Sequence, residues 1–190
     1  MVPFVCERRS GRRSCSAATV STFDTSVEGA PLSPFLAIYG SRVGTVRLRV
    51  LRIGVSGFVN EGFLPDDGLV TIRCVKYSSV ATGGIDQTLT PVAIDSRHGR
   101  PTTSLCAVLT GAVVPTTVGT LGTARVLSRS ADLVSALTPS PALVFDFSSE
   151  RGGVLLRSSR EGVGVALESS DLLVSQVMTC SAWIDWVEDF

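Results

Sequence analysis

Hydrophobic and polar residues alternate along the stretch Arg42–Phe58, and this pattern predicts a long β-strand. The apolar positions are first Val46, Leu48 and Val50, and then, one residue out of phase, Leu51, Ile53 and Val55. Without an inserted residue, such a slip turns every later side chain to the wrong face of the sheet. We therefore predict a β-bulge near Val50–Leu51, which keeps both apolar sets in the core and bends the strand.

Shorter runs of the same kind recur along the chain, separated by turns rich in Gly, Pro and Thr. We expect strands at Phe35–Tyr39, Val70–Cys74, Leu89–Ile94, Thr103–Leu109, Thr123–Leu127, Leu143–Phe147, Val154–Leu156, Val163–Leu167 and Ser175–Val187. The one helix candidate is Ser130–Leu137, which has a possible serine cap and ends before two prolines. Many short strands with at most one helix predict an all-β, antiparallel β-sandwich of a jelly-roll-like form.

The first thirty residues differ from the rest, because they contain no hydrophobic run long enough for a core or a secretory signal. They carry four clustered arginines, Arg8, Arg9, Arg12 and Arg13, followed by a stretch of Ser, Thr and Ala. We predict an extended arm over residues 1–30 that binds a partner, and a sandwich domain over residues 31–190. A nucleic-acid-binding arm and an organelle transit peptide are the alternatives for this segment.

The composition is apolar for a chain of 190 residues, with 44% hydrophobic and 18% charged residues and a mean hydropathy of +0.35. No run reaches the eighteen or so apolar residues of a membrane span, so we expect burial of the excess, partly against other subunits. The formal net charge is zero. A chain without net charge has no overall field that attracts nucleic acid or a membrane, and we therefore expect protein partners.

The cysteines and the histidine do not form a recognisable metal motif. There are five cysteines and one histidine, His98, and no Cys-x-x-Cys occurs. Zinc sites need a cluster of such ligands. We therefore expect no metal and no other cofactor, and free thiols fit a reducing compartment of assembly.

Two groups of residues have the side chains of known hydrolases, and neither predicts an enzyme. Asp95, Ser96 and His98 are the residue types of a catalytic triad, but three neighbours in one loop cannot be assumed to reach its geometry. Near Trp186, a glycosidase-like pair of carboxylates can be drawn from Asp185, Glu188 and Asp189. Acidic residues at the end of a strand are usually solvated, so we predict no catalytic residues.

The last predicted strand contains both tryptophans, Trp183 and Trp186, which fall on opposite faces of the strand. A domain of this size has one sandwich interior, so one ring serves the core and the other needs a second covering surface. We consider two explanations. Either the strand passes from one environment to another, or the two tryptophans mark a subunit interface.

From Leu32 onward the order of segments resembles poorly characterised β-sandwich virion proteins of tailed bacteriophages. Four stretches carry this resemblance: Val46–Gly54, Thr90–Ser96, Val154–Leu167 and Ile184–Asp189. They match, in order, a first long strand, a Pro-x-x-hydrophobic-Asp segment, a Leu-Arg…Glu-Gly-hydrophobic repeat and a closing Trp-x-Glu strand. The resemblance implies an oligomeric particle protein on the head surface or in a fibre.

The leading hypothesis from the sequence is therefore a non-enzymatic virion structural protein. It would be a capsid-associated decoration, cement or head-fibre protein, held by its N-terminal arm, assembled in the host cytoplasm and bound to the major capsid protein or other virion proteins. The resemblance favours a homotrimer. One alternative is a tail or baseplate protein that binds a receptor or carbohydrate. Another is a small jelly-roll coat protein whose basic arm contacts the genome.

Overall fold

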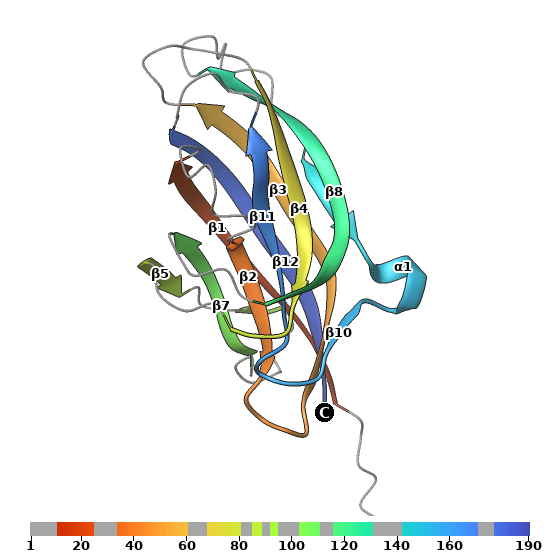
Figure 1. Ribbon diagram of the computed structural model, residues 1–190. Coiled ribbons are helices and arrows are strands. Elements are labelled where there is room, and N and C mark those ends of the chain that lie inside the picture. Colours follow the sequence, from red (N-terminus) through yellow and green to blue (C-terminus); the bar gives the residue numbers. More distant parts are fainter. Residues whose placement is uncertain are drawn as a thin grey trace, which may run out of the picture.

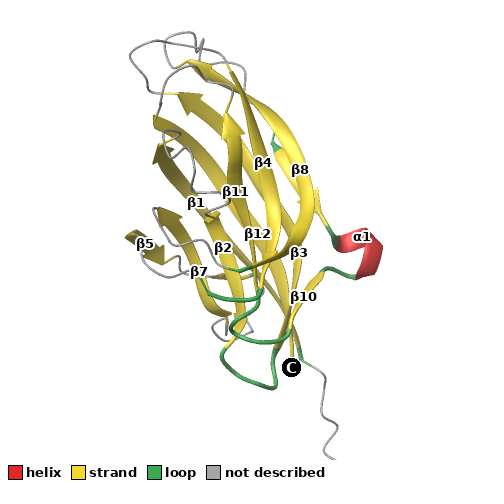
Figure 2. Cartoon of the chain, viewed as in Figure 1, coloured by secondary structure: helices red, strands yellow, loops and turns green. Residues whose placement is uncertain are grey.

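The computed structural model describes residues 11–24, 34–60, 68–80, 85–88, 92–94, 103–110, 116–130, 142–170 and 177–190. Nearly all of these residues lie in strands, and α1 (Ser148–Arg151) is the one helix among them (Figure 2). The strands form two sheets, which Figure 1 shows as two layers. The all-β expectation is thus confirmed.

Sheet A has the spatial order β6-β1-β12-β3, and β3 also pairs with β9 and β10. Its strands are β1 (Arg12–Asp24), β3 (Arg47–Asn60), β6 (Val92–Ala93), β9 (Leu143–Asp146), β10 (Val154–Leu156) and β12 (Val177–Asp189). All of these pairs are antiparallel. The long strands β1, β12 and β3 therefore form the body of this sheet.

Sheet B has the order β5-β7-β2-β11-β4-β8, again with antiparallel neighbours. Its strands are β2 (Pro34–Ser41), β4 (Gly68–Tyr77), β5 (Ile85–Thr88), β7 (Thr103–Thr110), β8 (Thr117–Ser130) and β11 (Gly162–Ser170). The two sheets meet at one corner, where the ends of β3 and β8 form a short parallel pair.

The connections identify the sandwich as a jelly roll. The first long strand, β1, pairs with the last, β12, and the second, β2, pairs with the last but one, β11. Moving inward along the chain, β3 pairs with β9 and β10, and β4 pairs with β8. The chain is therefore a long hairpin rolled so that its partner strands alternate between the two sheets, and this strand order confirms the jelly-roll expectation.

One hydrophobic core lies between the sheets and takes side chains from both of them. Sheet B contributes mainly Leu36, Ile38, Ile72, Cys74, Val163 and Val165, and sheet A contributes Cys15, Leu48, Val50, Ile53, Val55, Phe145, Leu156, Ala182, Ile184 and Trp186. Within each strand these residues are mostly two apart, as expected for one face of a sheet.

The predicted bulge lies in β3 at Leu51. Across β12, Asp185 pairs with Arg52 and Trp186 pairs with Val50, so Leu51 is the extra residue. The apolar residues on both sides of the slip belong to the core, while Leu51 itself is only half-buried. On the other edge of β3, the backbone N–H of Phe147 donates to the Leu51 carbonyl at 2.8 Å. The bulge therefore also marks the point where the partner of β3 changes from β10 to β9.

Two stretches expected to lie outside strands belong to the sheets. Residues Arg12–Asp24 of the expected arm form β1, which pairs with β12 along its whole length. Strand β8 begins at Thr117, six residues before the expected strand Thr123–Leu127. Both segments consist largely of Ser, Thr, Ala and Gly, so their hydrophobic alternation is weak. Residues 1–10 of the arm and residues 131–137 of the expected helix lie outside the described residues.

Candidate functional site

Strand β12 places its two tryptophans on opposite faces, as the alternation predicts. Trp186 is fully buried in the core, and its indole nitrogen has no hydrogen-bond partner in the structure. Trp183 lies on the outer face of sheet A, where its ring covers Gly54 of β3 so closely that a side chain at Gly54 would overlap it. Trp186 is therefore the ring that serves the core, and a subunit contact through Trp183 stays a prediction.

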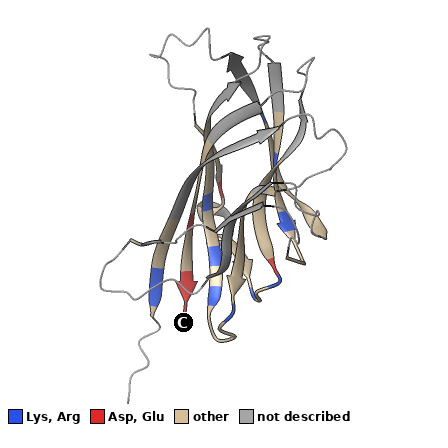
Figure 3. Ribbon diagram, turned by 90° about the vertical axis from the view of Figure 1, so that its left-hand side faces the viewer, with Lys and Arg blue, Asp and Glu red and all other residues tan. Residues whose placement is uncertain are grey.

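The outer face of sheet A carries rows of charged side chains across neighbouring strands. Asp189 of β12 lies between Arg12 of β1 and Arg47 of β3, and Asp185 lies between Ser16 and Arg52. Figure 3 shows basic positions on both sides of the acidic end of β12. Asp189 forms ion pairs with Arg12 at 3.5 Å and with Arg49 at 2.9 Å. Cross-strand pairs of opposite charge stabilise this arrangement modestly.

A further ion pair lies on the inner face of the same two strands. Arg13 contacts Glu188 at 3.3 Å, and the Glu188 side chain is 0% exposed. The Arg13 guanidinium also lies 4.7 Å from the centre of the Phe190 ring, which is a cation–π geometry. Because a buried carboxylate needs a partner, this pair fixes the start of β1 to the end of β12.

The four arginines of the expected arm therefore divide into two groups. Arg8 and Arg9 lie outside the described residues, while Arg12 and Arg13 bind carboxylates at the end of β12. The second pair therefore helps to hold β1 against β12, with Arg12 on the outer face and Arg13 on the inner face, and this is a role that a free arm would not have. The pairing was hard to find in the sequence because the partners are more than 170 positions apart.

Glu188 forms no glycosidase pair with the other two carboxylates near Trp186, because it lies on the other face of β12. Glu188 points into the sandwich toward Arg13, whereas Asp185 and Asp189 lie on the outer face and contact Arg52 and Arg49. Two carboxyl groups that flank one sugar must reach the same site, and groups on opposite faces of a strand do not. Asp95, Ser96 and His98 lie outside the described residues.

Two free cysteines, Cys15 of sheet A and Cys74 of sheet B, are buried in the core. Burial raises the pKa of Cys74 from 9.0 to about 12. The pKa of Cys15 is also raised to about 12, by burial first and then by the nearby charge of Glu188, while Arg13 acts in the opposite direction. Within the described ranges, no group of three His, Cys, Asp or Glu residues is placed to hold a metal ion.

A shallow basin opens beside the charged end of β12. It has a volume of about 390 Å³ and is lined by Gly11, Arg12, Arg49, Gly152, Asp189 and Phe190. Phe190 is 48% exposed. The basin thus combines guanidinium donors, one carboxylate and an aromatic ring, and it can recognise an anion or a planar group. The alternation of Arg47, Arg49 and Arg52 along β3 was the sequence signal for this surface, but their clustering with Arg12 depends on the pairing of β1.

The outer face of sheet B has a different character. Tyr39, Val75 and Tyr77 are fully buried although they lie on the face that points away from the core. Tyr39 lies over Gly162, where an added Cβ would come within 2.5 Å of the ring. Burial, and next the neighbouring Tyr39, raises the pKa of Tyr77 above its ordinary value. This face is therefore an interior surface and offers no open site at these residues.

None of the helices in the described ranges is long and apolar enough to cross a membrane. No family model matches this sequence, and no curated protein matches it.

Two solved structures are similar to the chain. The crystal structure of the decameric BFDV capsid protein is 11% identical, covers 95% of this chain and 99% of that chain, and has a TM-score of 0.37. The crystal structure of the infectious bursal disease virus VP2 subviral particle is 15% identical, covers 89% of this chain and 41% of that chain, and has a TM-score of 0.11. Neither likeness assigns a family, and the jelly-roll assignment rests on the strand order of this chain itself.

Proposed function

We propose that this protein is a virion structural protein, which acts by assembly with other protein subunits and not by catalysis. The observation that carries the proposal is the strand order, in which β1 pairs with β12 and β2 pairs with β11. Eight-stranded jelly rolls of this kind form viral capsid proteins, lectins and cupins. The resemblance of four segments to phage virion proteins favours the first of these classes.

The side chains of the described residues also support an assembly role. The sandwich interior is filled by aliphatic and aromatic side chains. The carboxylates that sequence analysis considered for catalysis are bound to arginines of neighbouring strands. In the finer form of the proposal, the protein is a capsid-associated decoration, cement or head-fibre protein. It forms trimers and is anchored by the residues before β1.

A shell-forming coat protein is the second candidate. It is favoured by the position of Gly11, the first described residue, which lines the basin beside Arg12 and Arg49 at the arginine-rich end of the sandwich. In a coat protein this end would face the genome, and the sandwiches themselves would form the shell. A decoration protein, by contrast, forms small closed oligomers and needs a preformed shell.

Self-assembly of the purified protein separates the two candidates. The full chain and a variant lacking residues 1–10 are compared by light scattering and negative-stain electron microscopy. A deletion up to Ala30 is unsuitable, because it removes β1 and with it the pairing of β12. Shells would favour the coat protein, and closed trimers that bind preformed capsids only with residues 1–10 present would favour the decoration protein. A monomer that binds no capsid would contradict both.

A further inference from the structure

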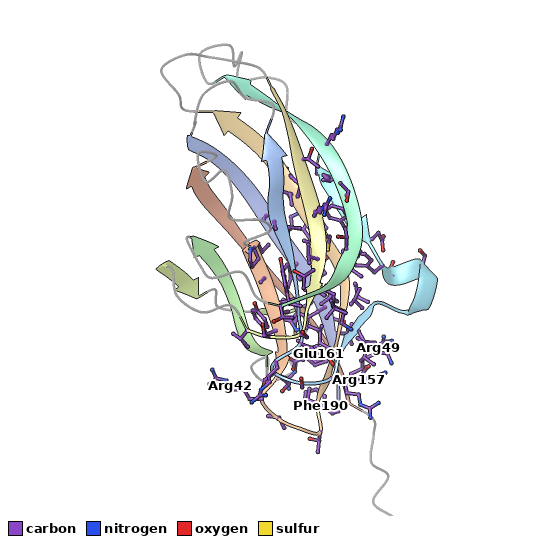
Figure 4. The ribbon with its side chains drawn as sticks, in the orientation of Figure 1. Arg42, Arg49, Arg157, Glu161 and Phe190 are labelled. Atoms are coloured by element: carbon purple, nitrogen blue, oxygen red, sulfur yellow. The ribbon has the colours of Figure 1, made fainter. Side chains whose placement is uncertain are left out.

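Eight of the thirteen basic residues of the described chain lie at one end of the sandwich. The zero net charge of the whole sequence does not reveal this local excess. This basal end comprises the start of β1, the turn between β2 and β3, the start of β3, the end of β4, the loop between β10 and β11, and the end of β12. Its basic residues are Arg12, Arg13, Arg42, Arg47, Arg49, Lys76, Arg157 and Arg160, and its acidic residues are Glu161, Glu188 and Asp189. Figure 4 shows Arg42, Arg49, Arg157, Glu161 and Phe190 together at this end.

The acidic residues neutralise only part of this charge. Glu188 is taken up by Arg13 inside the sandwich. Asp189 is shared by Arg12 and Arg49, and Arg47 lies opposite it on β3. Two guanidinium groups therefore contact one carboxylate on the outer face, and a third arginine, Arg47, stands in register with it on the neighbouring strand. Each guanidinium has five N–H donors, and a single shared carboxylate uses few of them. The side chain of Arg12 is 63% exposed, so its donors face solvent.

The basin at the same end adds a stacking surface. Phe190 lines it together with Arg12 and Arg49, and Arg13 lies over the Phe190 ring. A basic groove beside an exposed aromatic ring is the arrangement by which proteins bind single-stranded nucleic acid, with phosphates on the arginines and a base on the ring. The volume of about 390 Å³ lies within the range of small-molecule pockets and suits one nucleotide unit.

We propose that the basal end binds single-stranded nucleic acid, with Arg12, Arg47 and Arg49 contacting phosphates and Phe190 stacking on a base. An acidic peptide would satisfy the arginines but would leave the ring without a planar partner. The proposal does not depend on the virion role, because a jelly-roll protein of any function could have a basic end with an exposed aromatic ring. The zero net charge of the chain led us to expect no binding of nucleic acid. Phosphates, however, interact with the arginines close to them, so the local distribution of charge matters more than the total.

Fluorescence anisotropy of the full-length protein with a labelled oligothymidylate of about 20 nucleotides tests the proposal. We expect Arg47→Gln to weaken binding and to reduce the slope of log K against log salt by about 0.7, the contribution of one single-strand phosphate contact. Arg47 is suited to this test because its removal leaves the ion pairs of Asp189 with Arg12 and Arg49 in place. Phe190→Ala should weaken binding roughly five- to 150-fold, as expected for one lost base stack.

Arg125→Gln is the matched control, because Arg125 is an exposed arginine of β8 opposite Thr71, away from the basal end. It should bind like the unchanged protein. Each variant is first shown to be folded by circular dichroism. Equal weakening by Arg125→Gln and Arg47→Gln would overturn the proposal, as would loss of binding only in an Arg8→Gln, Arg9→Gln double variant. Poly-glutamate that displaces the oligonucleotide at equal charge concentration would also overturn it, in favour of an acidic peptide.

Discussion

Strands β11 and β12 are interior strands of the two sheets, and most of their outward-facing residues differ in size and exposure. In β12 these residues include Trp183, Asp185 and Asp189, all partly exposed. In β11 the corresponding positions are Gly162, Gly164 and Ala166, and all of them are buried. Both strands direct the alternate residues into the same core. The difference therefore concerns only the outer faces.

The small residues of β11 allow close contact with β2, the neighbouring strand of the same sheet. An added Cβ at Gly164 would come within 2.6 Å of the Leu36 carbonyl oxygen, and one at Gly162 would meet the Tyr39 ring. At Tyr39, Val75, Tyr77 and Gly164 sheet B is buried on both faces, which is unusual for an antiparallel sheet. Its outermost strand, β8, is exposed at Thr123 and Arg125. Sheet A has one dry face and one wet, charged face.

The largest effect is expected from placing a charge on the outward face of β11. Gly164→Asp adds a carboxylate to a buried position and forces the backbone of β2 to move. We expect a loss of several kcal/mol, enough to unfold a domain of ordinary stability. Urea unfolding followed by near-UV circular dichroism measures it. Gly119→Asp in β8 is the control, because a Cβ there meets nothing within 4 Å. If Gly164→Asp folds normally, the outer face of sheet B is open and the comparison fails.

The two tryptophans of β12 test the inner and outer faces of one strand. Trp186→Ala removes a fully buried ring from the core and should destabilise the protein by about 3–5 kcal/mol. Trp186→Phe should cost less, because the indole nitrogen has no hydrogen-bond partner in the structure to lose. Trp183→Ala should leave the fold intact, and it should weaken self-association if Trp183 forms a subunit contact. Equal losses of the free energy of unfolding in the two alanine variants would contradict this assignment of faces.

Two adjacent carboxylates at the end of β12 provide a comparison of ion pairs. Glu188→Gln removes the charge facing Arg13 at a fully buried position, and we expect a loss of about 3 kcal/mol. Asp189→Asn removes a charge that is 35% exposed, so the loss should be no more than about 1 kcal/mol. Denaturant unfolding at neutral pH gives both values. A larger loss for Asp189→Asn would show that the outer row of charges, and not the inner pair, holds β1 to β12.

The sequence predicted those parts of the fold in which large apolar residues alternate with charged ones. In β3 the alternation of leucine, valine and arginine is strong enough to reveal even the bulge at Leu51. Strand β1 was missed because its small residues, such as Ser14 and Ala18, give no clear period. The basal arginine cluster was missed for a different reason: Arg12 and Arg49 meet through Asp189, and no pattern within one strand reports a pairing across three strands.

The smallest effects are expected for the two buried thiols. They lie on the two sides of the same core, Cys15 in sheet A and Cys74 in sheet B. The pKa values of Cys15 and Cys74 are raised to about 12. Because the folded pKa exceeds the ordinary 9.0, both thiols favour the folded state below pH 9, and this contribution is lost as the pH rises toward 12. At pH 8 both should therefore react slowly with iodoacetamide, as measured by peptide mass spectrometry. Glu188→Gln lowers the negative charge beside Cys15 alone, so it should speed alkylation of Cys15 relative to Cys74. Equal acceleration of both thiols would instead indicate general loosening of the sandwich, because the electrostatic effect of Glu188 acts on Cys15 and not on Cys74.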